Sequence, residues 1–225
     1  MCRKHPPLSH AAPRAIVAPM NDLYQEYRAR VYASLSCCGV AVFVLVCGSV
    51  QFLRSDLDWI VAPLSYYLTG PYGMVVITAY LALSIALILL GLGFRSILAA
   101  PARSGVPAAL FVVAGITLAL TALSEPAKLG EHPMEWEAVH RFAAMTTFLC
   151  VTVAMMLQSF WLRFDPAWRG RFAFSFALAA AAFVALWVYA LIHTLPHGLA
   201  QKTVIALIVI WLGWASLALL RHTRG

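Results

Sequence analysis

Six apolar stretches, each close to 20 residues long, set the strongest limit on how this 225-residue chain can fold. An α-helix needs about 20 apolar residues to cross the hydrocarbon core of a bilayer. Strands of a membrane barrel are about ten residues long and alternate apolar with polar residues, a pattern that these stretches lack. The sequence therefore predicts an all-α, polytopic membrane bundle of six transmembrane helices. The expected spans cover residues 32–53, 72–94, 105–124, 139–161, 171–193 and 202–220.

The composition excludes several classes of protein. Hydrophobic residues make up 62% of the chain and charged residues only 11%, whereas a soluble domain carries roughly 25% charged residues. A soluble enzyme and a nucleic-acid-binding domain are therefore excluded. The expected partner is the lipid bilayer itself.

The basic residues are sorted between the two sets of connecting segments. Twelve of the 16 Lys and Arg residues lie in one set of segments: residues 1–31, 95–104, 162–171 and 221–225. Six of the nine acids lie in the opposite set. Cytoplasmic loops of membrane proteins are enriched in Lys and Arg. We therefore expect both termini to be cytoplasmic and the chain to lie in a bacterial inner membrane. Residues 1–31 are expected to be a disordered basic tail, residues 32–220 the transmembrane domain, and residues 221–225 a short cytoplasmic end.

The first outer connection is long and rich in aromatic residues. Asp56 and Asp58 can act there as general bases or metal ligands, or they can be hydrated loop acids, one of them close to Arg54. The segment continues through Ser65-Tyr66-Tyr67, and Trp and Tyr rings favour the membrane interface. Ser65, Tyr66 and Tyr67, together with Gln201 at the start of the last span, are the predicted substrate-binding residues.

A carboxylate and a histidine lie at the outer ends of the third and fourth spans. Glu125 is placed at the edge of the hydrocarbon, where an ionised group is costly and often functional. His140 follows Glu137 by three residues, so the two share a helix face. An imidazole beside a carboxylate can transfer protons or bind a metal. The predicted catalytic residues are therefore His140, Asp56, Asp58 and Glu125; the alternatives are a buried histidine bonded to a neighbouring helix and a carboxylate that reaches water.

His193 and His197 end the fifth span in the sequence His-Thr-Leu-Pro-His. On a continuous helix both rings would share a face, but Pro196 is expected to end the helix here. His193 is expected at the same depth as His140, and this pair is the predicted metal site. Two such histidines on different helices can also ligate a b-type haem, although no cofactor is assigned from the sequence.

Four features of the chain resemble the DUF998 family of six-helix integral membrane proteins. They are the segment Leu64–Gly73 before the second span, Glu125 after the third, His140 at the start of the fourth, and Gly198-Leu199-Ala200-Gln201-Lys202 before a final helix with two tryptophans. The resemblance covers about residues 32–220. Lys202 stands where the family pattern leads us to expect Arg. The family has no established function, so the resemblance implies an architecture and no substrate.

These observations leave three functions open. The first is a non-catalytic membrane protein, a sensor or a binder of a lipid or small apolar ligand, with an outward-facing His and carboxylate cluster. The second is an enzyme that acts on a lipid or lipid-linked headgroup at the periplasmic face, and the third is haem-mediated electron transfer. An alanine-rich stretch at 177–182 in the fifth span also allows close helix packing, and so a homo-oligomer.

Overall fold

The computed structural model describes residues 14–130 and 132–223, and all regular secondary structure in these ranges is helical. Six long helices make up the fold: α1 (Arg14–Leu53), α2 (Gly73–Ile97), α3 (Gly105–Ala127), α4 (Pro133–Leu162), α5 (Phe172–Leu191) and α6 (His197–His222). Three short 3-10 helices lie between them: η1 (Leu64–Leu68), η2 (Ala100–Ala102) and η3 (Arg169–Arg171). Each long helix contains a segment long and apolar enough to cross a membrane. The predicted six-helix, all-α architecture is confirmed.

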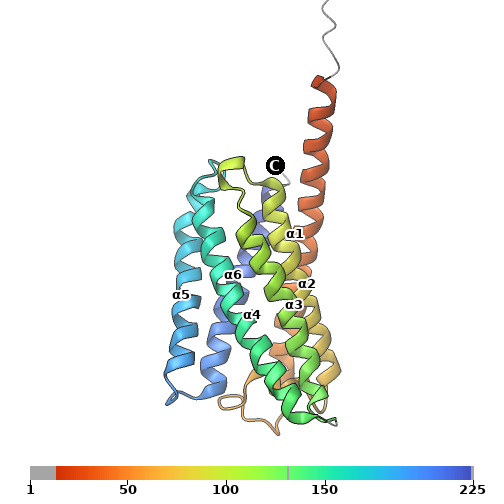
Figure 1. The fold of residues 1–225 in the computed structure, drawn as a ribbon, viewed down its shortest axis with the longest axis vertical. Coiled ribbons are helices and arrows are strands. Elements are labelled where there is room, and N and C mark those ends of the chain that lie inside the picture. The colour runs from red at the N-terminus through yellow and green to blue at the C-terminus, as the bar shows by residue number, and fades with distance from the viewer. Residues whose placement is uncertain (1–13, 131, 224–225) are drawn as a thin grey trace, which may run out of the picture.

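The six helices form a closed ring. Each one packs against the next along the chain, and α6 returns to pack against α1 (Figure 1). Short connections force neighbouring helices to run antiparallel, which produces this order. We call the end formed by residues 54–72, 128–132 and 192–196 the mouth end. The end formed by residues 98–104, 163–171 and 221–223 is the arginine end.

Hydroxyl groups join helices that are distant in the sequence. The Oγ atoms of Ser36 on α1 and Ser216 on α6 lie 2.9 Å apart. Trp211 of α6 donates its indole N–H towards Ser159 of α4 and Ser175 of α5, at 3.2 and 3.1 Å. Helices in lipid gain little from the hydrophobic effect, so packing and such hydrogen bonds hold them together. The contacts of Trp211 join α4, α5 and α6 in the half of the bundle nearer the arginine end.

The helix boundaries differ from the expected spans in three places. α1 begins at Arg14 and projects beyond the bundle (Figure 1), so residues 14–31 are helical where we expected a disordered tail; residues 1–13 lie outside the described residues. Adding residues to an existing helix costs much less than starting one, and residues 20–31 contain neither Gly nor Pro. α4 and α6 also begin earlier, at Pro133 and His197, because polar residues can extend a helix past the hydrocarbon.

Candidate functional site

Arg54 holds the long connection at the mouth end in shape. Its guanidinium is buried and pairs with both carboxylate oxygens of Asp56 at 2.8 Å, while Nη1 donates to the carbonyl oxygen of Thr69, also at 2.8 Å. It lies against Gly70, whose φ of +73° is a conformation that glycine adopts without strain. The hydrogen bonds from Arg54 lower the pKa of Asp56. Asp56 therefore forms an ion pair with Arg54, as in the alternative that it is a loop acid close to Arg54. It also lines the mouth cavity that is described below.

Asp58 shapes the turn that follows. Its Oδ1 accepts a hydrogen bond from the backbone N–H of Ile60 at 2.8 Å, and its backbone carbonyl accepts from Ala62 at 2.7 Å. The second oxygen, Oδ2, makes no hydrogen bond or ion pair among the described residues, so Asp58 retains a free acceptor at the mouth.

The N-terminus of α6 docks on the same loop. The first amide groups of a helix have no partner inside the helix; here Gly198 donates to the carbonyl of Val61 at 3.0 Å and Leu199 to that of Ile60 at 2.8 Å. A Cβ at position 198 would lie 2.4 Å from the carbonyl oxygen of Ala62, so only glycine fits. Gln201 adds a buried contact, since its Oε1 accepts from the backbone N–H of Leu64 at 2.9 Å. The Gly198–Lys202 motif therefore anchors the loop to the helix.

His140 is the most precisely positioned side chain at the mouth. It is buried, and its Nδ1 lies 3.0 Å from Oε2 of Glu125, 3.1 Å from the carbonyl oxygen of Thr121 and 3.3 Å from Oγ of Ser124. A carbonyl and a carboxylate only accept hydrogen bonds, so Nδ1 carries the proton. In the neutral imidazole Nε2 then holds the lone pair, and Nε2 has no polar partner among the described residues.

Lys128 connects this pair to a second carboxylate. Its Nζ lies 2.8 Å from Oε2 of Glu125 and 2.7 Å from Oε2 of Glu137. Partial burial lowers the pKa of Lys128, but the two carboxylates outweigh burial and leave the pKa raised. Arg141 lies 3.5 Å from Oε1 of Glu137. The helical spacing suggested Glu137 as the partner of His140; instead Glu125, from the neighbouring helix, contacts the imidazole.

Two cavities meet at His140. The mouth cavity, of about 700 Å³, has a charged rim with Asp56, Asp58, Lys128, Glu137 and Arg141. The inner cavity is narrow, about 70 Å³, and lies between α1, α2, α3, α4 and α6 among mostly apolar side chains, including Phe43, Leu87, Val151 and Leu212. Both cavities are lined by Ser65, His140, Ala144, Phe148 and Gln201. The two spaces are thus adjacent and share one wall, with a charged rim on the outer cavity and an apolar lining in the inner one.

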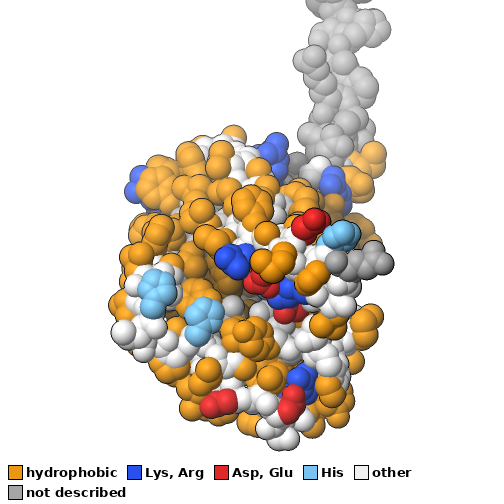
Figure 2. Space-filling model, turned by 60° about the horizontal axis from the view of Figure 1, so that its bottom comes forward, with side chains coloured by type: hydrophobic (Ala, Val, Ile, Leu, Met, Phe, Trp, Pro, Cys, Tyr) orange, Lys and Arg blue, Asp and Glu red, His pale blue; other side chains and the backbone are white. Residues whose placement is uncertain are grey.

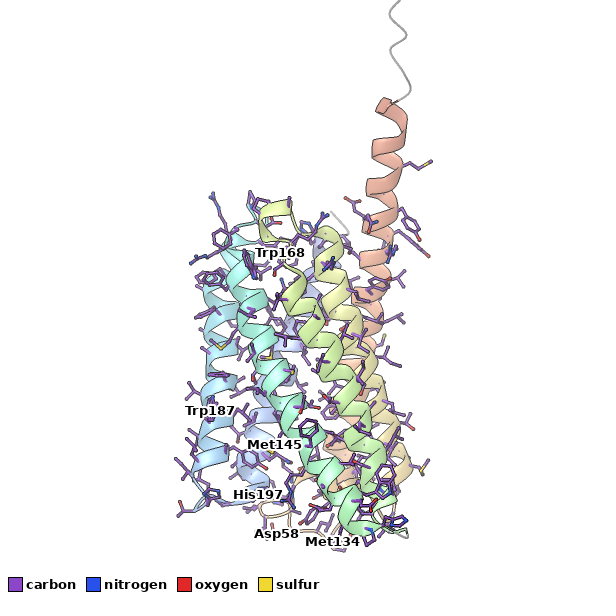
Figure 3. The ribbon with its side chains drawn as sticks, viewed as in Figure 1. Asp58, Met134, Met145, Trp168, Trp187 and His197 are labelled. Carbon is purple, nitrogen blue, oxygen red and sulfur yellow. The ribbon has the colours of Figure 1, made fainter. Side chains whose placement is uncertain are left out.

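Figure 2 views the mouth end and shows acidic, basic and histidine side chains around a hollow with orange, apolar walls. Figure 3 places Asp58 and His197 at this end, with Met145 higher on α4. These three residues come from the loop, α6 and α4, and all of them line the mouth cavity.

The histidines are not arranged as the sequence suggested. His193 follows the end of α5 and is exposed, and it does not line the cavities that His140 lines. His197 does line the mouth cavity, and its Nε2 lies 3.0 Å from the hydroxyl of Tyr189. Residues 14–130 and 132–223 contain no group of three or more His, Cys, Asp or Glu residues that could hold a metal. The predicted metal pair of His140 and His193 is not brought together, because α5 ends at Leu191 and the chain turns away.

The two tyrosines of the first connection have different environments. Tyr66 is exposed on the rim of the mouth cavity. Tyr67 is fully buried, with the cationic groups of Arg54 and Lys202 at 5.9 and 5.3 Å from its ring centre, and burial raises its pKa. Tyr67 lines neither cavity, and its role in substrate binding stays a prediction.

Sequence reasoning missed Lys128, Arg141 and Tyr189, and it considered His197 without assigning it to the site. Lys128 and Arg141 were sorted by charge alone, yet Lys128 follows Glu125 by three positions and Arg141 follows Glu137 by four, a spacing that could have indicated them. Tyr189 and His197 approach each other only because α5 and α6 are antiparallel. No local signal in the sequence marks that contact.

Comparison with known proteins places the chain in a family. A family model described as "Protein of unknown function (DUF998)" matches residues 37–218, a segment that runs from the middle of α1 into α6 and includes every residue of the mouth and inner cavities. No curated protein and no solved structure matches the chain. The match covers most of the chain and confirms the resemblance seen in the sequence motifs. The protein is a multi-pass membrane protein that belongs to the DUF998 family.

Proposed function

We propose that this protein binds an amphiphilic ligand, a lipid or a lipid-like molecule, across the two adjacent cavities. The single observation behind the proposal is that five residues, from Ser65 to Gln201, line both the charged mouth cavity and the apolar inner cavity. A ligand that fills both spaces needs a polar head and an apolar tail. The narrow inner cavity suits a chain better than a fused ring system.

The polar head would lie at the rim. Nε2 of His140 has its lone pair free in the neutral imidazole, so it can accept a hydrogen bond from a hydroxyl or amine. Lys128 and Arg141 supply donors that are already partly neutralised by Glu125 and Glu137. The rim has no large excess of either charge, which favours a zwitterionic or polyhydroxylated head over a strongly anionic one.

The tail would follow α4 inward. The lining residues of this helix extend from His140 to Val151, a distance of roughly 16 Å along the helix axis. Met145 lines the mouth cavity and is also exposed, so the cavity is accessible along the side of α4. This supports entry from the membrane, and the charge sorting of the loops favours the periplasmic leaflet of a bacterial inner membrane as its source.

The test fills the junction between the two cavities. Ala144 lines both of them, so Ala144→Trp is expected to abolish binding of a fluorescent single-chain lipid analogue to the purified full-length protein. Ala109→Trp is the matched control, since Ala109 is exposed on α3 and lines neither cavity. Equal binding by wild type and both variants would refute the proposal.

A second candidate is an enzyme that acts on the bound headgroup, and the fixed tautomer of His140 favours it. A histidine whose Nδ1–H is held by a backbone carbonyl beside a carboxylate presents Nε2 as a general base. Turnover of a lipid mixture by reconstituted protein would be followed by mass spectrometry, and His140→Gln should remove it while lipid binding remains. Absence of any turnover, with binding intact, would leave the protein a binder or sensor.

A further inference from the structure

The arginine end carries a second open cavity that the proposed function does not use. Its volume is about 680 Å³, and its lining includes Arg28 of α1, Arg95 of α2, Arg103 of the α2–α3 connection and His222 of α6. Glu26 is the one acid that lines it. Three arginines against one glutamate leave a formal charge of +2 with His222 neutral.

The arginines of this cavity form no ion pair with a carboxylate whose side chain the structure describes. At the mouth end Arg54, Lys128 and Arg141 each form an ion pair with a carboxylate within 4 Å. No ion pair among residues 20, 23–130 and 132–223 includes Arg28, Arg95 or Arg103. Like charges that converge without internal neutralisation repel one another. An external anion would relieve that repulsion.

Local contacts hold the arginines at the cavity. Nε of Arg103 donates to the carbonyl oxygen of Leu98 at 3.0 Å, which leaves the other guanidinium nitrogens available. Nη2 of Arg28 donates to the hydroxyl of Tyr32 at 3.0 Å. A Cβ at position 105 would lie 2.5 Å from Nη1 of Arg95, so Gly105 provides the space for that guanidinium. The guanidinium of Arg95 makes no hydrogen bond among the described residues.

We infer that this cavity binds the phosphate group of an anionic ligand. Guanidinium groups present paired N–H donors that match phosphate oxygens, and they are always charged. The cavity lies where the apolar segments of α2 and α6 end, at the level of lipid headgroups. Basic pockets between helices at this level bind the headgroups of anionic lipids. A phospholipid headgroup and free phosphate share this chemistry.

The experiment compares an anionic and a zwitterionic phospholipid, which share the phosphate and differ in the alcohol attached to it. Delipidated full-length protein in detergent is titrated with phosphatidylglycerol and with phosphatidylcholine of the same acyl chains, and bound lipid is counted by native mass spectrometry. We expect phosphatidylglycerol to bind at least about tenfold more tightly, and Arg95→Gln with Arg103→Gln to remove that preference. Inorganic phosphate is added as a competitor in a second arm. If it displaces the lipid, the site recognises phosphate alone; if it does not, the lipid is the ligand.

The matched control removes two arginines from the same end but outside the cavity. Arg163→Gln with Arg169→Gln makes the same change in charge, and neither residue lines the cavity. This pair should retain the preference for phosphatidylglycerol. Equal loss in both double variants, or no preference in the wild type, would overturn the inference. If the first double variant is unstable, Arg95→Gln alone is used, because Arg95 holds no other residue in place by a hydrogen bond.

Discussion

At the scale of single residues, Glu125 is the group on which the mouth network depends. Its Oε2 lies within 3.0 Å of both Lys128 and His140, and its side chain is 8% exposed. Removing one partner of a buried ion pair costs more than the pair itself contributes, because the other charge remains buried. Glu125 therefore sets the position of the imidazole and neutralises the lysine.

We expect Glu125→Gln to lower the free energy of unfolding by about 2 kcal/mol, since Lys128 would lose the more buried of its two carboxylates. The measurement is denaturant unfolding in mixed micelles. Glu135→Gln is the matched control; Glu135 is 79% exposed and lies 3.9 Å from His132. An equal loss of stability in both variants would contradict the role given to Glu125.

Asp56 makes a prediction about pH. Its pKa is lowered in the folded protein by the hydrogen bonds from Arg54. The stabilisation from the pair is thus present above the unfolded pKa of about 3.9 and is lost as the pH falls through the lower folded value. Asp56→Asn should lower the midpoint of thermal unfolding at pH 7 and have less effect in strong acid. A difference from wild type that grows on acidification would contradict this assignment.

At the scale of elements, the contact between the first connection and α6 decides whether the mouth forms. The loop supplies carbonyl acceptors for the first amides of α6, and Gln201 returns an acceptor to the loop. Neither segment has this partner within its own sequence neighbourhood. The Gly198–Lys202 motif therefore docks the start of α6 on the first connection.

Gly198→Ala should destabilise the protein by about 1–3 kcal/mol, because its Cβ would overlap the carbonyl group of Ala62 and displace the loop. The same substitution at Gly48, where a Cβ would meet nothing within 4 Å, should be neutral or stabilising by about 0.5–1 kcal/mol. Thermal unfolding of the two variants provides the comparison. A stable Gly198→Ala protein that still binds the lipid analogue would show that the docking contact is dispensable.

At the scale of the whole molecule, the orientation in the membrane follows from charge. The arginine end holds most of the basic residues and should face the cytoplasm, with the mouth end outside. In a cysteine-free background, His132→Cys should react with a membrane-impermeant thiol reagent in intact spheroplasts, while Arg169→Cys should react only after lysis. Both positions are exposed at opposite ends of the bundle. The reverse pattern of labelling would invert the topology and place the lipid site in the inner leaflet.

Much of the fold was predictable because the hydrocarbon core of the bilayer constrains each membrane-spanning segment separately. Each span must satisfy its own backbone hydrogen bonds and present apolar side chains, so a window of about 20 residues is sufficient to recognise it. The helix ends were less predictable. α1, α4 and α6 continue past the apolar window, because a helix does not stop where the hydrocarbon stops.

The candidate site was predictable only in part. The charge sorting placed His140, Glu125 and the loop acids at one end of the bundle, and all of them are at the mouth end. Their pairing was not predictable, since Arg54 engages Asp56 and Glu125 replaces Glu137 beside the imidazole. His193 and Tyr67 were expected in the site and lie outside it or buried beneath it. These outcomes depend on the rotation of each helix, which hydropathy does not report.

The sequence by itself determined that this chain crosses a membrane six times and that six of its nine acids lie on one side of the bundle. Those properties depend on hydration and charge, which each segment carries independently of the others. Only the tertiary structure decided which charges neutralise one another, which nitrogen of His140 remains open, and that a polar and an apolar cavity lie side by side. Those properties depend on distances of a few ångströms between helices, and packing alone sets such distances.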